Sequence, residues 1–216
     1  MMNENQEPVI QQAKSILLRG GVVACATESF YGLAVDAGDE AAIRKLFSLK
    51  NREPGKPVLI LIPSAESLAE YVTHIPPIAF PLIHAFWPGG LTLIFEASKK
   101  ISHLLTGGTG TIGIRLSSHP VPTALARAIQ GPITGTSANI SGGPPCRRAE
   151  EVAAYFGQRI DLIIDSGETD GGAGSTVFDV TTDPPRIVRE GMVTRQALKK
   201  SLQAAIAWHE EKTSRI

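Results

Sequence analysis

Three cations stand close together in a segment rich in proline and glycine. Lys50, Arg52 and Lys56 lie in the stretch LKNREPGKPV, just beyond a pattern typical of an amphipathic helix. Such a group suits a triphosphate, because arginine binds phosphate oxygens through paired hydrogen bonds and lysine acts as a point charge. The alternative is a solvated helix C-terminus, where cations interact favourably with the helix dipole. Taken by themselves, the three residues favour this alternative.

A second polar group follows a short apolar run. The segment ITGTSANISGGPP carries Thr136, Ser137, Asn139 and Ser141 ahead of paired glycines and prolines. Short donors and acceptors in such a loop can grip a phosphate or a nucleoside. They can equally satisfy the backbone of their own turn. The residue types leave both interpretations open.

Two single residues at strand ends are further candidates for ligand binding. Thr27 ends the apolar run VVACA, so its hydroxyl could hydrogen-bond a ligand or cap a turn, and the sequence does not decide between them. Arg115 lies within the apolar run IGIRL. A lone arginine in a strand needs an anionic partner or an exposed face. A carboxylate ligand would satisfy it, and so would a structural aspartate or glutamate.

Two glycine-rich segments imitate nucleotide-binding motifs without meeting their requirements. Gly108, Gly110 and Gly113 have the spacing of the dinucleotide fingerprint, but a strand pattern follows them where that motif needs a helix. The run DGGAGST, residues 170–176, has no lysine after its glycines and is not a phosphate-binding Walker loop. The five histidines show no pair at metal-ligand spacing, so no metal ligand is assigned. No neighbouring residues suggest a nucleophile with its base.

The elements that position these groups mix helices and strands. Helical patterns cover residues 10–17, 79–86, 121–129, 149–156 and 194–208, and two more helices are expected after Asp39 and Ser64, which can cap them. Apolar runs predict strands at 22–26, 59–62, 91–95, 112–116, 133–136, 162–164, 176–180 and 187–188. Several neighbouring strands have no helix between them. We therefore expect an α/β fold with a twisted mixed parallel and antiparallel sheet and helices on its faces.

Composition narrows the class of protein. The chain has 216 residues and a formal net charge of zero, from 21 basic and 21 acidic side chains, which argues against a dedicated nucleic-acid binder. Cys25 and Cys146 suggest neither a disulfide framework nor a zinc site. The N-terminus lacks the apolar stretch of a signal peptide, and no apolar run is long enough for a membrane span. We expect a cytoplasmic protein without membrane contact, forming one domain over residues 1–216 with its core at about 8–192.

Several motifs in order resemble one known family. They are TESFYGLAVDA, LKNREPGKPVLILI, FWPGGLTLIF, TIGIRLSSHP, GTSANISGGPP, STVFDV and PRIVREG. Each is weak alone, but the ordered combination, from about Gly20 to Gly191, is similar to threonylcarbamoyl-AMP synthases of the YrdC-like family. The resemblance implies a twisted mixed sheet around a concave cavity. It also implies formation of threonylcarbamoyl-AMP and pyrophosphate from L-threonine, bicarbonate and ATP, normally with magnesium. A threonylcarbamoyl transferase complex would pass the group to tRNA, and direct RNA binding by this chain is expected to be weak.

The resemblance also assigns roles to individual positions. Lys50 and Arg52 match paired cations near the ATP phosphates and are the candidate catalytic residues, with Ser137 and Asn139 matching an S-x-N pair beside them. On the amino-acid side, the resemblance assigns threonine contacts to Thr27, Arg115 and Ser175, with Arg115 suited to the carboxylate. The remaining nucleotide-side matches are Thr111, Lys56 and Arg189.

Some positions depart from the family pattern. Ala26 stands where a proline often precedes the threonine-binding threonine, Leu61 stands about where many members have a histidine, and Glu190 replaces a common proline. The chain resembles the short form of the family, without the extra C-terminal domain. Rival interpretations are an RNA-binding module of the same fold, a relative with a different substrate, and the related domain of hydrogenase maturation proteins, whose paired zinc-binding cysteines are absent here.

Overall fold

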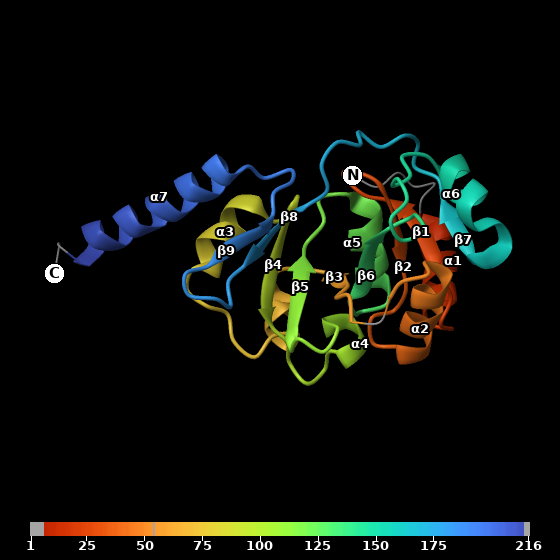
Figure 1. The fold of residues 1–216 in the computed structure, drawn as a ribbon, viewed down its shortest axis with the longest axis horizontal. Coiled ribbons are helices and arrows are strands. Elements are labelled where there is room, and N and C mark those ends of the chain that lie inside the picture. Colours follow the sequence, from red (N-terminus) through yellow and green to blue (C-terminus); the bar gives the residue numbers. More distant parts are fainter. Residues whose placement is uncertain (1–6, 54, 214–216) are drawn as a thin grey trace.

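Nine strands form one mixed sheet in the computed structural model, which describes residues 7–53 and 55–213 (Figure 1). The sheet order is β7-β1-β2-β6-β3-β5-β4-β8-β9, with parallel pairs β1/β7, β3/β5 and β4/β8 and the other neighbours antiparallel. The strands are β1 Val23–Ala26, β2 Tyr31–Ala34, β3 Leu59–Leu61, β4 Leu91–Glu96, β5 Thr111–Arg115, β6 Ile133–Ser137, β7 Leu162–Ile164, β8 Thr176–Asp179 and β9 Arg186–Arg189. The predicted mixed α/β sheet is confirmed.

Helices pack on both faces of this sheet. They are α1 Glu7–Leu17, α2 Glu40–Leu49, α3 Ala79–Phe86, α4 His103–Thr106, α5 Pro120–Ala128, α6 Ala149–Phe156 and α7 Arg195–Thr213, with short 3-10 turns at Glu66–Glu70 and Gly157–Arg159. In Figure 1, α7 projects away from the sheet beyond α3. Within the described residues, no helix is long and apolar enough to cross a membrane.

The two faces of the sheet bury separate apolar cores, because successive side chains of a strand point to opposite sides. Val23 and Cys25 of β1 face α1 and α5, in a cluster that also holds Leu17, Leu125 and Ile133. The alternate residues of the strands pack on the opposite face with α2, α3 and α4, and this larger cluster includes Ala24, Leu33, Ile43, Leu46, Ile60, Leu82, Phe95, Leu105 and Ile114. Helices α1 and α5 cover only part of their face, which leaves the rest of it open.

Local sequence signals fix most helix bounds. The Asp39 side chain accepts hydrogen bonds from the backbone N–H groups of Ala41 and Ala42 at 2.8 and 3.2 Å, as predicted for the cap of α2. Pro120 begins α5, where its missing N–H is tolerated. Predicted and observed bounds coincide for α3, for α6 and for β7.

Three sequence expectations need correction. Ser64 does not cap a helix: a 3-10 turn begins at Glu66, and the Ser64 carbonyl accepts a hydrogen bond from the Ser67 hydroxyl at 2.8 Å. Strand β2 was not predicted, because Gly32 and the polar residues before it indicate a loop. The short helix α4 was also missed. The predicted domain bounds include residues 1–6 and 214–216, which lie outside the described part of the chain.

We expect Asp39→Ala to lower the free energy of unfolding by about 1 kcal/mol, because two N–H groups at the start of α2 lose their acceptor. Asp39→Asn is the matched control, since asparagine caps a helix about as well as aspartate. Urea unfolding followed by circular dichroism measures both variants. Equal stability of Asp39→Ala and the unchanged protein would contradict the capping role.

Candidate functional site

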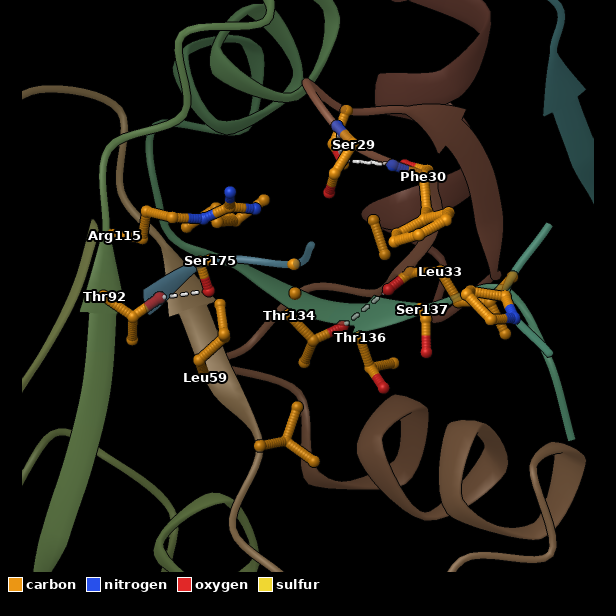
Figure 2. A pocket seen from close by; sticks show the side chains of 18 of the residues that line it. Ser29, Phe30, Leu33, Leu59, Thr92, Arg115, Thr134, Thr136, Ser137 and Ser175 are labelled. Atoms are coloured by element: carbon orange, nitrogen blue, oxygen red, sulfur yellow. Dashed lines mark hydrogen bonds between the residues drawn. The ribbon is translucent and has the colours of Figure 1, made fainter. Parts of the chain in front are cut away.

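The open part of the sheet face forms a cavity of about 520 Å³. Residues of β1, β2, β3, β4, β5, β6 and β8 line it, together with the loop after β1 and the segment before β8. Figure 2 shows Arg115, Ser175 and Thr92 on one side of this space and Phe30 and Ser29 on the other. The lining residues that matter for the chemistry are Thr27, Ser29, Arg52, Thr92, Arg115, Ser137, Asn139, Ser175 and Arg189.

Glycines keep the cavity floor low. Gly113 of β5 and Gly135 of β6 lie on either side of Leu59 of β3, because each of these strands pairs with β3. A Cβ atom at Gly113 would lie 3.2 Å from Leu59 Cβ, and one at Gly135 would lie 2.4 Å from Leu59 Cδ1. Larger residues at these two positions would therefore compete with Leu59 for the floor of the cavity.

Arg115 is a buried cation at one end of the cavity. Its Nη1 donates to Glu28 in an ion pair whose side chains are 7% and 9% exposed. The other Glu28 oxygen accepts a hydrogen bond from the Ser117 hydroxyl at 2.6 Å. The Nε of Arg115 is buried and has no hydrogen-bond acceptor among the described residues. Burial and the nearby Arg189 lower the pKa of Arg115 to about 10, so it remains charged at neutral pH.

Arg189 reaches the cavity beside Ser175. Its Nε and Nη2 donate to the Ser175 carbonyl at 3.2 and 2.8 Å, and Nη2 lies 3.3 Å from the Ser175 hydroxyl. That hydroxyl in turn accepts a hydrogen bond from Thr92 at 2.8 Å, drawn as a dashed line in Figure 2. The position predicted to hold threonine, Ser175, and the predicted nucleotide-side position, Arg189, are thus in direct contact.

Lys50 lies beneath the S-x-N loop and is 2% exposed. Its Nζ donates to the Ser137 carbonyl and to the Asn139 carbonyl, the latter at 2.7 Å. Above it, the Ser137 hydroxyl donates to Asn139 Oδ1 at 2.5 Å, and Asn139 Nδ2 donates to the Gly143 carbonyl at 2.5 Å. Burial, and secondarily Arg52, lower the pKa of Lys50 to about 8. Lys50 therefore supports the loop from below and is not among the residues that line the cavity.

Two further lining residues bond to their own loops. Arg52 donates from Nε to the Lys56 carbonyl at 3.2 Å and from Nη2 to the Pro57 carbonyl at 2.7 Å. The Thr27 hydroxyl donates to the Phe30 carbonyl at 2.7 Å and accepts from the N–H groups of Ser29 and Phe30, both at 3.3 Å. The turn-capping alternative for Thr27 is therefore present, and the residue also lines the cavity.

The structure brings together most of the residues singled out in the sequence. Lys56 and Thr111 are the exceptions besides Lys50: Lys56 pairs with Glu53 at 2.8 Å, the Thr111 hydroxyl lies 3.0 Å from that of Thr109, and neither residue lines the cavity. Leu61, which the sequence resemblance sets about where many family members have a histidine, does line it.

Sequence reasoning missed Glu28, Ser117 and Thr92. Glu28 could have been predicted as a partner of Arg115, because a buried arginine needs an anion and Glu28 directly follows the candidate residue Thr27. Ser117 and Thr92 gave no signal, since their roles depend on strand pairing and on the Arg115–Glu28 geometry.

The electrostatics of the cavity favour anions. Arg52, Arg115 and Arg189 line it, and no aspartate or glutamate is found among the described lining residues. No group of three or more histidine, cysteine or acidic side chains suited to a metal occurs in residues 7–53 and 55–213. The arrangement suits a ligand that carries several negative charges.

Comparison with known proteins found similar sequences and similar structures. The family model Sua5_yciO_yrdC, described as telomere recombination, matches residues 15–191. The chain is 38% identical to the threonylcarbamoyl-AMP synthase of Pyrococcus abyssi over 195 residues, which are 90% of this chain and 57% of that protein. It is 35% identical to the threonylcarbamoyl-AMP synthase of Vibrio parahaemolyticus, covering 84% of this chain and 98% of that one. The crystal structure of P. abyssi Sua5 complexed with L-threonine superposes with a TM-score of 0.86 at 38% identity, over 89% of this chain and 56% of that chain.

We expect Lys50→Met to lower the free energy of unfolding by about 2 kcal/mol or more, because the Ser137 and Asn139 carbonyls lose a buried charged donor. Lys45→Met is the matched control, on the helix α2 that Lys50 directly follows: Lys45 pairs with Asp161 at 2.8 Å, but both side chains are more than 40% exposed. Its loss should be at most about 1 kcal/mol. Urea unfolding compares the two, and equal losses would show that Lys50 does not fasten the loop.

Proposed function

Because the chain belongs to the Sua5/YciO/YrdC family, we propose that it is a threonylcarbamoyl-AMP synthase that acts on L-threonine, bicarbonate and ATP. The observation that carries the proposal is the cavity, where three arginines and several hydroxyls converge without a lining carboxylate. A triphosphate and an amino-acid carboxylate both need such surroundings. The product would serve a separate enzyme complex that modifies adenosine in tRNA, and we expect any direct binding of RNA to this chain to be weak.

The reaction needs positioning more than a protein nucleophile. The threonine amine forms a carbamate with carbon dioxide from bicarbonate. A carbamate oxygen then bonds to the α-phosphorus of ATP, the bond from that phosphorus to the β-phosphate oxygen breaks, and pyrophosphate leaves with the electron pair. Because the substrates supply both nucleophile and leaving group, the protein contributes orientation and charge stabilisation.

We propose that threonine and the ATP phosphates bind at different ends of the cavity. Arg115 would hold the threonine carboxylate, with Thr27 and Ser175 beside it. Arg52 and the Ser137–Asn139 loop would hold the phosphates. Arg189 touches Ser175, so we place the carbamate and the α-phosphate near this contact.

Three predicted nucleotide-side residues lie outside the cavity lining. Lys50 would act through the loop that it supports, since its Nζ is bonded to the two loop carbonyls. The contacts of Lys56 and Thr111 with the nucleotide stay predictions. Magnesium would accompany ATP and neutralise phosphate charge; hydroxyl and amide oxygens line the cavity, and we assign no protein ligand to it.

We expect pyrophosphate release to require threonine and bicarbonate together. Serine should be poorer by about 10- to 200-fold in kcat/KM, because one methyl group contributes little more than this in an apolar pocket. The assay supplies ATP, magnesium and bicarbonate and varies the amino acid. ATP turnover that is indifferent to the amino acid would contradict the proposal.

Two arginine variants test the division of the cavity. Arg115→Lys should raise the KM for threonine about 10- to 100-fold with a smaller effect on ATP, because lysine cannot form the paired bonds to a carboxylate. Arg52→Ala should lower turnover about 100-fold, if it stabilises phosphate charge in the transition state. Arg44→Ala, an exposed arginine of α2, is the control. A reversed pattern, with ATP affected by Arg115→Lys, would place the substrates the other way round.

A further inference from the structure

Glu28 has a carboxylate side chain that is 9% exposed and pairs with Arg115, a residue of the cavity lining. It follows Thr27, but is not itself among the residues that line the cavity. One of its oxygens accepts from Arg115 Nη1 and the other from the Ser117 hydroxyl at 2.6 Å. Both oxygens therefore have a partner on β5 or just beyond its end.

The turn that carries Glu28 is fixed by several bonds. The Thr27 hydroxyl donates to the Phe30 carbonyl at 2.7 Å and so closes the turn around Glu28. The Gly171 N–H donates to the Ser29 carbonyl at 2.9 Å, which ties the turn to the segment before β8. Because its backbone is held at both sides, Glu28 can act as a fixed anchor for Arg115.

The Glu28–Arg115 pair differs in burial from the other ion pairs of the described residues. Among the described residues, it is the ion pair in which both side chains are less than a tenth exposed. A guanidinium removed from water needs a counter-charge, and the residues lining the cavity supply none. Glu28 thus neutralises Arg115, and none of the described residues that line the cavity is an anion.

The geometry of Arg115 leaves one edge of the guanidinium unused. Glu28 bonds to Nη1, whereas Nε has no acceptor within the described part of the chain. A buried donor without an acceptor is unfavourable, so a ligand oxygen at this position would relieve it. The Nε and Nη2 donors of an arginine form a fork that matches a carboxylate.

We propose that Glu28 is a positioning residue of the amino-acid subsite: it holds Arg115 by Nη1 so that the Nε–Nη2 edge receives the substrate carboxylate. This inference rests on the proposed function and deepens it. It opposes a second arrangement, in which the Glu28 carboxylate occupies the place of the substrate and has to leave before threonine binds. The two arrangements predict opposite effects of removing the charge.

The test is Glu28→Gln, which keeps the size of the side chain and removes its charge. Calorimetry with L-threonine alone measures binding, and steady-state kinetics measure KM for threonine and for ATP. We expect the threonine Kd and KM to rise about tenfold or more, with KM for ATP and turnover at saturating threonine changed less than about threefold. Unchanged or tighter threonine binding would overturn the proposal. Glu70→Gln, which removes an exposed partner of Lys100, is the matched control.

Ser117→Ala keeps the charge of Glu28 and removes one of its two hydrogen bonds. It should raise the threonine Kd and KM in the same selective way, by about two- to fivefold. If Glu28→Gln does not fold, as judged by circular dichroism, this variant decides alone, and the absence of an effect overturns the proposal.

The double variant Glu28→Gln/Arg115→Lys asks whether Glu28 acts through Arg115. Their effects on threonine binding should be far from additive, because each disturbs the same contact. Additive effects would overturn the positioning role. If the wild-type protein binds threonine and releases pyrophosphate, and Glu28→Gln behaves identically, this inference is wrong and the proposed function stands. A wild-type protein that does neither defeats the proposed function and this inference with it.

Discussion

The arrangement of the site depends on which oxygen atoms stabilise the cations that are removed from water. Lys50 and Arg115 are both nearly fully buried, and each needs oxygen partners to remain charged there. Lys50 finds them in the carbonyls of the S-x-N loop, whereas Arg115 finds a carboxylate. The difference matters, because a carbonyl solvates a cation and leaves its net charge in place, while a carboxylate neutralises it.

This difference gives the two ends of the cavity different net charge. Arg52 and Arg189, which line the cavity, are held by carbonyl oxygens, of Lys56 and Pro57 and of Ser175. Their charge remains available to a triphosphate, which carries several negative charges. Arg115 is already paired, so its end suits an amino acid that brings one carboxylate. The proposed division between nucleotide and threonine therefore follows from the partners of the cations as well as from their positions.

The sequence predicts local elements better than it predicts partners. The bounds of α6 and β7 follow from their apolar patterns, and Asp39 is a cap that short-range chemistry makes visible. Strand β2 was not predicted, because a glycine such as Gly32 is typical of a turn. The segment is a strand because it pairs with β1 and β6. Propensity is a weak guide where neighbouring strands supply the hydrogen bonds.

For the site, too, the sequence predicts which residues take part better than it predicts their contacts. Thr27, Arg52, Arg115, Ser137, Asn139, Ser175 and Arg189 were singled out in the sequence and do line one cavity. The direction of the Lys50 side chain was not predictable, because a lysine that follows a helix gives the same sequence pattern whether it points to a ligand or beneath a loop. Glu28 and Arg115 are 87 residues apart, and only the sheet brings them together. Long-range ion pairs of this kind are set by topology, which short motifs do not encode.

The partners of the cations also explain how the site could accelerate the proposed reaction, in which a substrate supplies the nucleophile. Each cavity cation is fastened before any ligand arrives: Arg115 by Glu28, Arg189 by Ser175, and Arg52 by the carbonyls of its own loop. Donors that are already oriented need little reorganisation when negative charge develops, and this preorganisation is a large source of transition-state stabilisation. Beneath the donors, glycines of β5 and β6 leave room for Leu59 between these two strands. For a reaction in which substrates provide both nucleophile and leaving group, such a rigid, oriented set of charges is the contribution that remains for the protein to make.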